Sequence, residues 1–204
     1  MRFTTQIGKA TDKGASRYGL SNVLVTPQND AVATDGQILA VSRFDGELAE
    51  PAYVADAPAT ATDLNANYAT AWTDAGWATT KRRKNKTDTI SSQNGRFPRC
   101  NDVLPEVPTD YVQFGIDTEL LRNLALSINS NGGKVLQLFV DTSKRHNQRA
   151  ILAVSGDNIG VIMPTTCDTT AAETYETRRK GLEYLNESIK TVNERIMTAV
   201  DSSN

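Results

Sequence analysis

The sequence predicts an α+β fold made of antiparallel sheets, and three observations support that prediction. Residues 18–44 alternate short, apolar, β-branched runs with turn signals. Residues 111–164 follow the order strand, helix and three strands. Residues 171–200 carry apolar side chains at intervals of three and four, as an amphipathic helix does. With 39% hydrophobic and 23% charged residues among 204, the composition is that of a globular chain.

The segment 18–44 is expected to form three short strands, at 18–25, 31–34 and 37–44. Pro27–Asp30 is a turn signal between the first two strands. Asp35-Gly36 separates the second from the third, and it indicates a hairpin because glycine accepts a positive φ angle. Before this segment, Gly8 and Gly14 argue against a stable helix.

Residues 45–94 have a different composition, rich in Ala, Thr, Asp and Asn with little periodicity. Trp72 and Trp77 are their only large apolar anchors. We expect a long insertion, functional or partly flexible, because structureless loops of this length are unusual in compact domains. The basic run Lys81–Lys86 is interpreted first as a solvated loop, with weak phosphate contact or a nuclear-type tag as alternatives.

The segment 111–164 gives the clearest pattern. We expect strands at 111–116, 134–140, 149–154 and 159–163. Between the first two, Asp117 is a good N-cap for a helix with an apolar stripe, and the segment 129–133 ends that helix. The stripe consists of Leu120, Leu121, Leu124 and Ile128. Residues 155–158 predict a tight turn between the last two strands.

A long C-terminal helix is expected from the capping-box pattern at Thr170–Glu173 to about Val200. Its apolar stripe consists of Leu182, Leu185, Ile189, Val192, Ile196 and Ala199. Such a stripe either packs on the parent domain or forms a short coiled coil with another copy. The expected organisation is therefore one domain over residues 1–168, followed by this helix at 169–204.

Composition and motifs argue against several functional classes. The net charge of −2 does not indicate a nucleic-acid partner by itself, and the two cysteines, Cys100 and Cys167, match no zinc spacing. There is no signal-peptide pattern and no apolar run long enough for a membrane helix, so we expect a reduced, cytoplasmic protein. The only histidine, His146, lies in a polar turn, and no phosphate loop, metal-ligand cluster or nucleophile elbow occurs. We expect no catalytic residue, metal or cofactor.

Three segments resemble the bacterial β sliding clamp, the β subunit of DNA polymerase III. Residues 17–40, ending Ala33-Thr34-Asp35-Gly36-Gln37-Ile38-Leu39-Ala40, look like part of that family's second domain. Residues 95–105, which begin Gly-Arg-Phe-Pro, look like its linker into the third domain. Residues 117–164, ending Gly160-Val161-Ile162-Met163-Pro164, resemble the last half of the third domain. The order of the three segments carries the resemblance, which covers about half of the chain.

The resemblance implies a single clamp-type domain made of two halves, each with a β-α-β-β-β order, plus the C-terminal helix. Two features depart from the family. The segment 45–94 has no clear counterpart, and the helix expected before Arg17 is missing. The C-terminal helix could fill that place, as in a circular permutation. This hypothesis predicts that the stripe of residues 182–196 packs on the sheet beside the helix at 118–128.

Sliding clamps bind short peptides of polymerases and repair proteins in an outer apolar pocket, and the resemblance carries that pocket over. The residues that match its first wall are Thr34, Gly36, Gln37, Ile38 and Leu39; its second, Pro98, Asp102 and Val103; its third, Val161, Met163 and Pro164. Met adapts to varied apolar partners, and Leu, Ile and Val give a dry floor. Gln37, Ile38 and Asp102 stand where the family usually has His, Arg and a basic residue, which puts the usual peptide in doubt.

The resemblance also implies contact with double-stranded DNA through basic groups. The residues expected there are Lys9, Lys13, Arg17, Arg122 and Lys134. The expected function is a non-enzymatic replication module that binds a polymerase or repair protein and forms a homo-oligomer. Because the family's ring contains six domains, a ring of this chain would be a hexamer. A monomeric or dimeric adaptor, or a phage-type structural protein that reuses the fold, stays open as an alternative.

Overall fold

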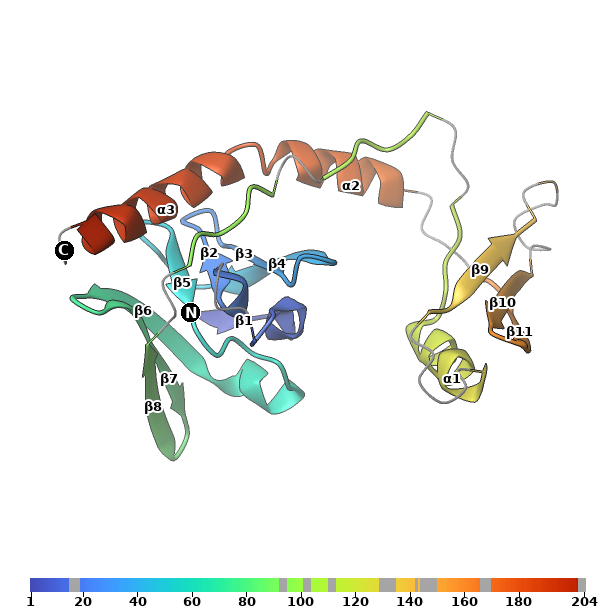
Figure 1. Ribbon diagram of the computed structural model, residues 1–204, viewed down its shortest axis with the longest axis horizontal. Helices are drawn as coiled ribbons and strands as arrows, with labels where there is room; N and C mark the ends of the chain where they lie inside the picture. Colours follow the sequence, from blue (N-terminus) through green and yellow to red (C-terminus); the bar gives the residue numbers. More distant parts are fainter. Residues whose placement is uncertain are drawn as a thin grey trace. The chain divides into compact units, whose positions relative to one another are not determined.

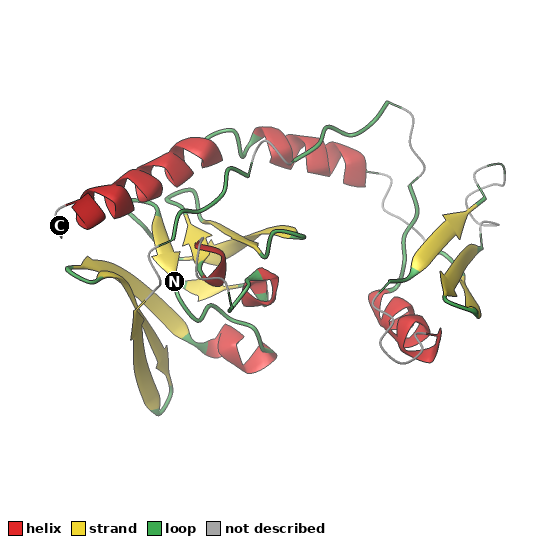
Figure 2. Ribbon diagram, in the orientation of Figure 1, coloured by secondary structure: helices red, strands yellow, loops and turns green. Residues whose placement is uncertain are grey.

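The computed structural model describes residues 1–14, 19–91, 95–100, 104–109, 113–128, 135–141, 143, 150–165 and 170–201. The chain divides into two compact units (Figures 1 and 2). Unit 1 comprises Met1–Pro105 and Gly181–Asn204, and unit 2 comprises Glu106–Lys180. This division differs from the expected single domain over 1–168, because the C-terminal helix belongs with the first strands and residues 106–180 form a unit of their own.

Unit 1 contains a five-stranded antiparallel sheet in the order β1-β4-β3-β2-β5. Its strands are β1 (Arg2–Phe3), β2 (Val23–Val25), β3 (Asp30–Thr34), β4 (Leu39–Asp45) and β5 (Ala52–Val54). The predicted turn at Pro27–Asp30 and the Asp35-Gly36 hairpin are both present, and Gly36 has a φ of 90°. The first predicted strand is shorter than expected, because the 3-10 helix η2 (Gly19–Ser21) precedes β2.

The segment 45–94 is regular structure rather than the long loop we expected. After β5 come the 3-10 helix η3 and a second sheet in the order β6-β7-β8 (Figure 2). Their bounds are η3 (Ala61–Asn65), β6 (Asn67–Thr73), β7 (Gly76–Arg83) and β8 (Lys86–Ser91). The alternation of Tyr68 and Trp72 with small residues marks one buried face, but Ala and Thr at the outer positions weaken the contrast that a periodicity search needs.

The same element order occurs three times along the chain. The first occurrence, in unit 1, is β1 followed by the 3-10 helices η1 (Ile7–Ala10) and η2 and the meander β2–β4. The second, also in unit 1, is β5 followed by η3 and the meander β6–β8. In unit 2, the segment at Gly115 is followed by a helix and a third meander. The bounds there are α1 (Thr118–Ile128), β9 (Gln137–Val140), β10 (Ile151–Ser155) and β11 (Asn158–Ile162). We expected two such halves. The part of the chain that the structure describes has three.

The C-terminal region forms two helices, where we expected one. Helix α2 (Ala171–Lys180) belongs to unit 2, buries no residue and is followed by a turn at 181–184. Helix α3 (Leu185–Asp201) belongs to unit 1 and lies along one face of the five-stranded sheet (Figure 1). Among the described residues, no helix is long and apolar enough to cross a membrane.

The core of unit 1 is the contact between α3 and the five-stranded sheet. The buried residues of the helix are Leu185, Ile189, Val192 and Ile196, each at most 3% exposed. The residues of the sheet that they join in one core include Leu24, Val32 and Tyr53. The stripe therefore packs within its own chain, as one of the two alternatives proposed. The neighbouring helix predicted for it, α1, belongs to unit 2.

Replacing Ile189 with alanine should destabilise unit 1 by about 2–5 kcal/mol, because the side chain is 1% exposed and its removal leaves a cavity. Urea unfolding measures the change. Lys190→Ala, at the adjacent exposed position of the same helix, should change the stability by less than about 0.5 kcal/mol. Equal effects of the two substitutions would contradict the placement of the stripe.

Candidate functional site

The sheet of unit 2 has one covered face. Its strand order is β11-β10-β9, and the register places Ile151 opposite Ile162 and Ala153 opposite Gly160. These four positions share the face that α1 covers, where Ile151, Ala153 and Ile162 are at most 5% exposed. Leu138, on the edge strand β9 opposite Ala153, is 40% exposed. The helix approaches closely at Gly160, where a Cβ atom would lie 2.5 Å from Cδ1 of Leu124.

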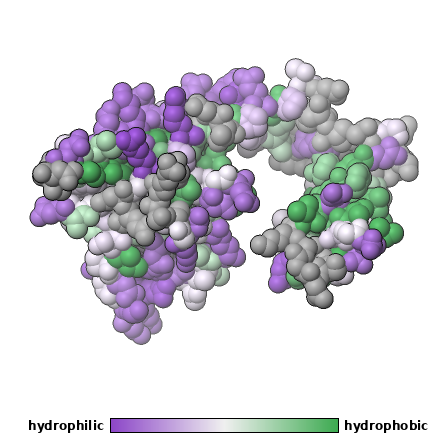
Figure 3. All heavy atoms as spheres, in the orientation of Figure 1, coloured by the Kyte–Doolittle hydropathy of each residue, from purple (hydrophilic) through white to green (hydrophobic). Residues whose placement is uncertain are grey.

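The opposite face of this sheet is apolar and exposed. Leu152 pairs with both Val161 and Phe139, and Val154 pairs with Ile159, so all five side chains point to the same side. The exposed fractions are 39% for Leu152, 53% for Phe139, 71% for Ile159 and 60% for Val161. We call these five residues the outer face of unit 2. On the side drawn in Figure 3, hydrophobic atoms gather over this unit. Uncovered apolar surface of this kind marks binding sites in soluble proteins.

The predicted third wall of the peptide pocket lies at the outer face. Val161 is part of the face, and Met163, directly after β11, is 55% exposed. Pro164 is half-buried. Just after these residues, Thr165 forms an isolated antiparallel bridge with Gly115. The amide of Thr165 donates to the carbonyl of Gly115 at 2.9 Å, which fixes the segment that follows β11.

The predicted first wall lies in unit 1, at the β3–β4 hairpin. Thr34 is buried and its hydroxyl accepts the amide of Gly36, at 3.0 Å. The carboxylate of Asp35 accepts the amides of Ile38 and Gln37, both at 2.8 Å, and these hydrogen bonds lower the pKa of Asp35. Asp35 therefore stabilises the turn of the hairpin that the Asp35-Gly36 signal predicted.

Ile38 and Leu39 differ in exposure. Leu39 is partly buried against the core, whereas Ile38 is 53% exposed and lines a groove of about 360 Å³ between η1 and β4. Lys9 lines the same groove. A residue expected to contact DNA and one expected to contact a peptide thus share one surface, which the sequence did not indicate.

The predicted second wall is described only in part. Pro98 is half-buried beside Phe97, while Asp102 and Val103 lie outside the described residues. Asn193 of α3 holds this segment: its Oδ1 accepts the amide of Phe97 at 2.9 Å, and its Nδ2 donates to the carbonyl of Phe97 at 3.1 Å. Burial raises the pKa of the nearby thiol of Cys100 to about 12, so this thiol stays protonated.

The predicted DNA contacts are distributed over both units. Lys9 and Lys13 are exposed in unit 1, and Arg122 is exposed on α1 of unit 2. Arg17 and Lys134 lie outside the described residues. All three described side chains are accessible, which is a requirement for phosphate contact.

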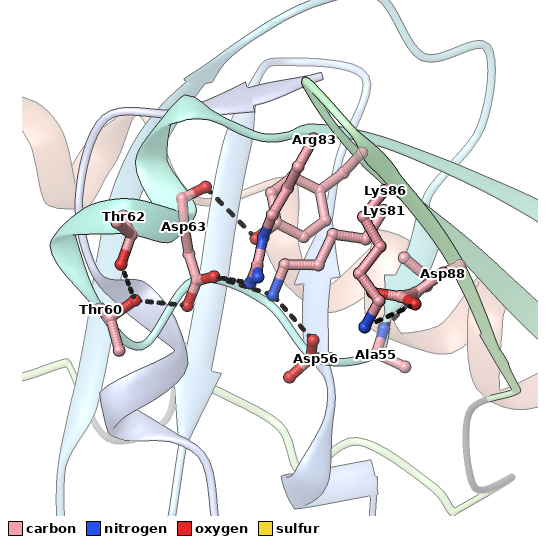
Figure 4. A network of polar contacts seen from close by, with 11 residues as sticks. Ala55, Asp56, Thr60, Thr62, Asp63, Lys81, Arg83, Lys86 and Asp88 are labelled. Carbon is pink, nitrogen blue, oxygen red and sulfur yellow. Dashed lines mark hydrogen bonds and ion pairs between the residues drawn. The ribbon is translucent and has the colours of Figure 1, made fainter.

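The basic run Lys81–Lys86 is exposed to solvent over residues 82–86, as in our first interpretation, but it is not a loop and its first residue is buried. It forms the β7–β8 hairpin, and Lys81 is 3% exposed (Figure 4). Its Nζ contacts Oδ2 of Asp56 at 2.8 Å and Oδ1 of Asp63 at 3.0 Å, and Arg83 pairs with the same oxygen of Asp63. The Lys81 ammonium also lies 5.6 Å from the centre of the Tyr68 ring. Lys81 is thus a structural residue of unit 1.

This ion-pair network controls two pKa values. Burial alone would raise the pKa of Asp63, but hydrogen bonds from Lys81 and Thr60 and the charges of Lys81 and Arg83 outweigh it and hold that pKa well below its usual range. Burial would lower the pKa of Lys81, but its hydrogen bonds to Asp56 and Asp63 raise it instead. Both groups are therefore charged at neutral pH.

No family model matches this chain, and no curated protein matches its sequence. The sliding-clamp resemblance therefore rests on the motifs and their order alone.

Replacing Asp63 with asparagine should destabilise unit 1 by on the order of 3 kcal/mol at neutral pH, because it leaves Lys81 buried without its full charge partner. The pKa of Asp63 is lower in the folded than in the unfolded chain. Its contribution is therefore complete above about pH 5 and is lost as the pH falls through the folded-state pKa. The difference in the free energy of unfolding between wild type and Asp63→Asn should therefore decrease at acid pH. Urea unfolding at several pH values measures this difference.

Asp88→Asn is the matched control, since Asp88 pairs with Lys86 at a more exposed position of the same sheet. Such surface pairs contribute about 0–1 kcal/mol. If the difference in unfolding free energy between wild type and Asp63→Asn stays constant from neutral to acid pH, the charge of Asp63 does not stabilise the fold.

Proposed function

We propose that this protein is a non-enzymatic binding module of the sliding-clamp type, which holds a short apolar peptide of a replication or repair protein. The observation that carries the proposal is the outer face of unit 2, where Leu152, Ile159 and Val161 are exposed together. A binding surface needs apolar area that its own chain leaves uncovered, and this face provides it beside the exposed Met163.

The three-fold occurrence of the strand–helix–meander order supports the clamp comparison, because the family's domains consist of such halves. Because the outer face of unit 2 is formed by apolar side chains, the proposed peptide is held by apolar contacts more than by charge. Two or three apolar anchors, each contributing about 1.5–3 kcal/mol of burial, give affinity on the order of micromolar after the cost of association.

Met163→Ala should weaken binding of a short synthetic peptide with two leucines and one phenylalanine. We expect a loss of about 1 kcal/mol, roughly fivefold in Kd, because the substitution removes all side-chain atoms beyond Cβ from a residue that is 55% exposed and available to a peptide. Fluorescence anisotropy with the full chain measures it, and a peptide with serines at the three apolar positions is the ligand control.

Met197→Ala is the matched protein control. Met197 is 39% exposed on α3 and lies outside the predicted pocket. No binding of the apolar peptide at high micromolar concentration, or the same loss for both methionine variants, would count against the pocket.

Light scattering of the full chain separates the ring from the adaptor. A closed homo-oligomer whose affinity for double-stranded DNA falls steeply with salt is expected for a ring, because Lys9, Lys13 and Arg122 would release counterions from phosphates. A monomer or dimer that binds the apolar peptide without binding DNA supports the adaptor instead.

A further inference from the structure

Four strands of the unit 1 sheet have counterparts in the described part of unit 2, whereas β5 has none there. In unit 1 the order is β1-β4-β3-β2, and in unit 2 the segment at Gly115 bridges to Thr165 just after β11, in a sheet ordered β11-β10-β9. The register agrees as well. Ala33 lies opposite Ala40 in unit 1, and Ala153 lies opposite Gly160 in unit 2.

In each unit, a helix packs on the face of the sheet that carries the small cross-strand pair; we call this the first face. In unit 2, α1 covers the face of Ala153 and Gly160. In unit 1, η1 lies against β3 and β4, on the groove lined by Ala40 and Ser42. In both units the short helix that precedes the meander packs on the side that carries the small residues.

The second face is buried in unit 1, whereas in unit 2 its described side chains are left exposed by their own unit. In unit 1 this face carries Leu24 and Val32, both 0% exposed under α3. The contacts that place α3 there come from the same face: Tyr53, the cross-strand partner of Leu24, donates to Asn193 at 3.5 Å, and Asp30 accepts a hydrogen bond from Tyr184.

Val32 directly precedes Ala33 and pairs with Leu24, just as Leu152 directly precedes Ala153 and pairs with Phe139. Phe139 and Leu152 are therefore the positions of unit 2 that are equivalent to Leu24 and Val32. Their exposed fractions are 53% and 39%. Within the described part of unit 2, α1 covers the other face and α2 buries no residue. Among the described residues of unit 2, no helix takes the place that α3 has in unit 1.

We propose that the outer face of unit 2 binds an amphipathic helix of a partner protein, in the way that α3 covers the equivalent face of unit 1. This deepens the proposed function, on which it rests, by naming the conformation of the partner segment. The expected helix carries apolar residues at intervals of three and four, like Leu185, Ile189 and Val192, and keeps a polar side toward solvent.

The probe is a fluorescein-labelled synthetic peptide with the sequence of residues 182–198, because this segment covers the equivalent face of unit 1. Titration with the full chain should give saturable binding, with a Kd on the order of micromolar. Ile159→Asp should weaken it about tenfold or more, because a charge would be buried under the helix. Since Ile159 is 71% exposed, the substitution leaves the core intact, and Leu152→Ala provides a second, uncharged variant.

Leu126→Asp is the matched control, since Leu126 is 66% exposed on α1 and lies outside the outer face. Binding that Leu126→Asp leaves unchanged and Ile159→Asp weakens supports the proposal. Three results overturn it. The peptide fails to bind at high micromolar concentrations of the full chain, Ile159→Asp leaves the Kd of the peptide unchanged, or the wild-type chain is a dimer that Ile159→Asp converts to a monomer. The short peptide with two leucines and one phenylalanine, tested with Met163→Ala, reports on the proposed function separately. If it binds while the helical probe does not, only the helix inference fails.

Discussion

Unit 1 depends on the burial of α3 against the five-stranded sheet. Leu185, Ile189 and Val192 are each at most 1% exposed there, and they cover Leu24 and Val32 of the sheet. Burial of apolar area is the largest favourable contribution to folding, so the sheet without this helix would expose the apolar side chains of that face. Polar contacts then fix the helix in place: Asn193 holds the backbone of Phe97, and Arg195 lies 5.4 and 5.3 Å from the rings of Trp72 and Trp77.

A second constraint holds the β6–β8 sheet to the rest of unit 1. Lys81 reaches Asp56, in the turn after β5, and Asp63, in η3, so one buried ammonium joins three segments. The hydroxyl of Thr79 accepts the amide of Ala55 at 2.8 Å next to it. Buried polar groups need such partners, and here the partners also specify how the sheet docks.

The sequence predicted the elements whose signals are local. The Asp35-Gly36 hairpin, the Asp117 cap of α1 and the α3 stripe were all recognisable because a turn, a cap or an apolar period determines them. The helical break at 181–184 was not predicted, since Leu182 continues the apolar period through it and the hydrogen bond from Tyr184 to Asp30 depends on tertiary contact. Lys81 was placed in solvent for a similar reason: its two acidic partners lie 25 and 18 residues away in sequence, and only the fold brings them together. Of the candidate site, the motif at Val161 and Met163 was recognisable, but the bare face around it required the strand register.

The connection of the two units has a consequence for synthesis. Unit 2 is inserted between Pro105 and Gly181, so the ribosome makes all of β1–β8 and then the whole of unit 2 before α3 emerges. At about 5–20 residues per second, the nascent sheet waits several seconds with its apolar side uncovered. A molecular chaperone has that interval in which to bind Leu24, Val32 and Tyr53. Premature termination within unit 2 would yield a chain with this side permanently bare, and such a chain would be prone to aggregation and proteolysis.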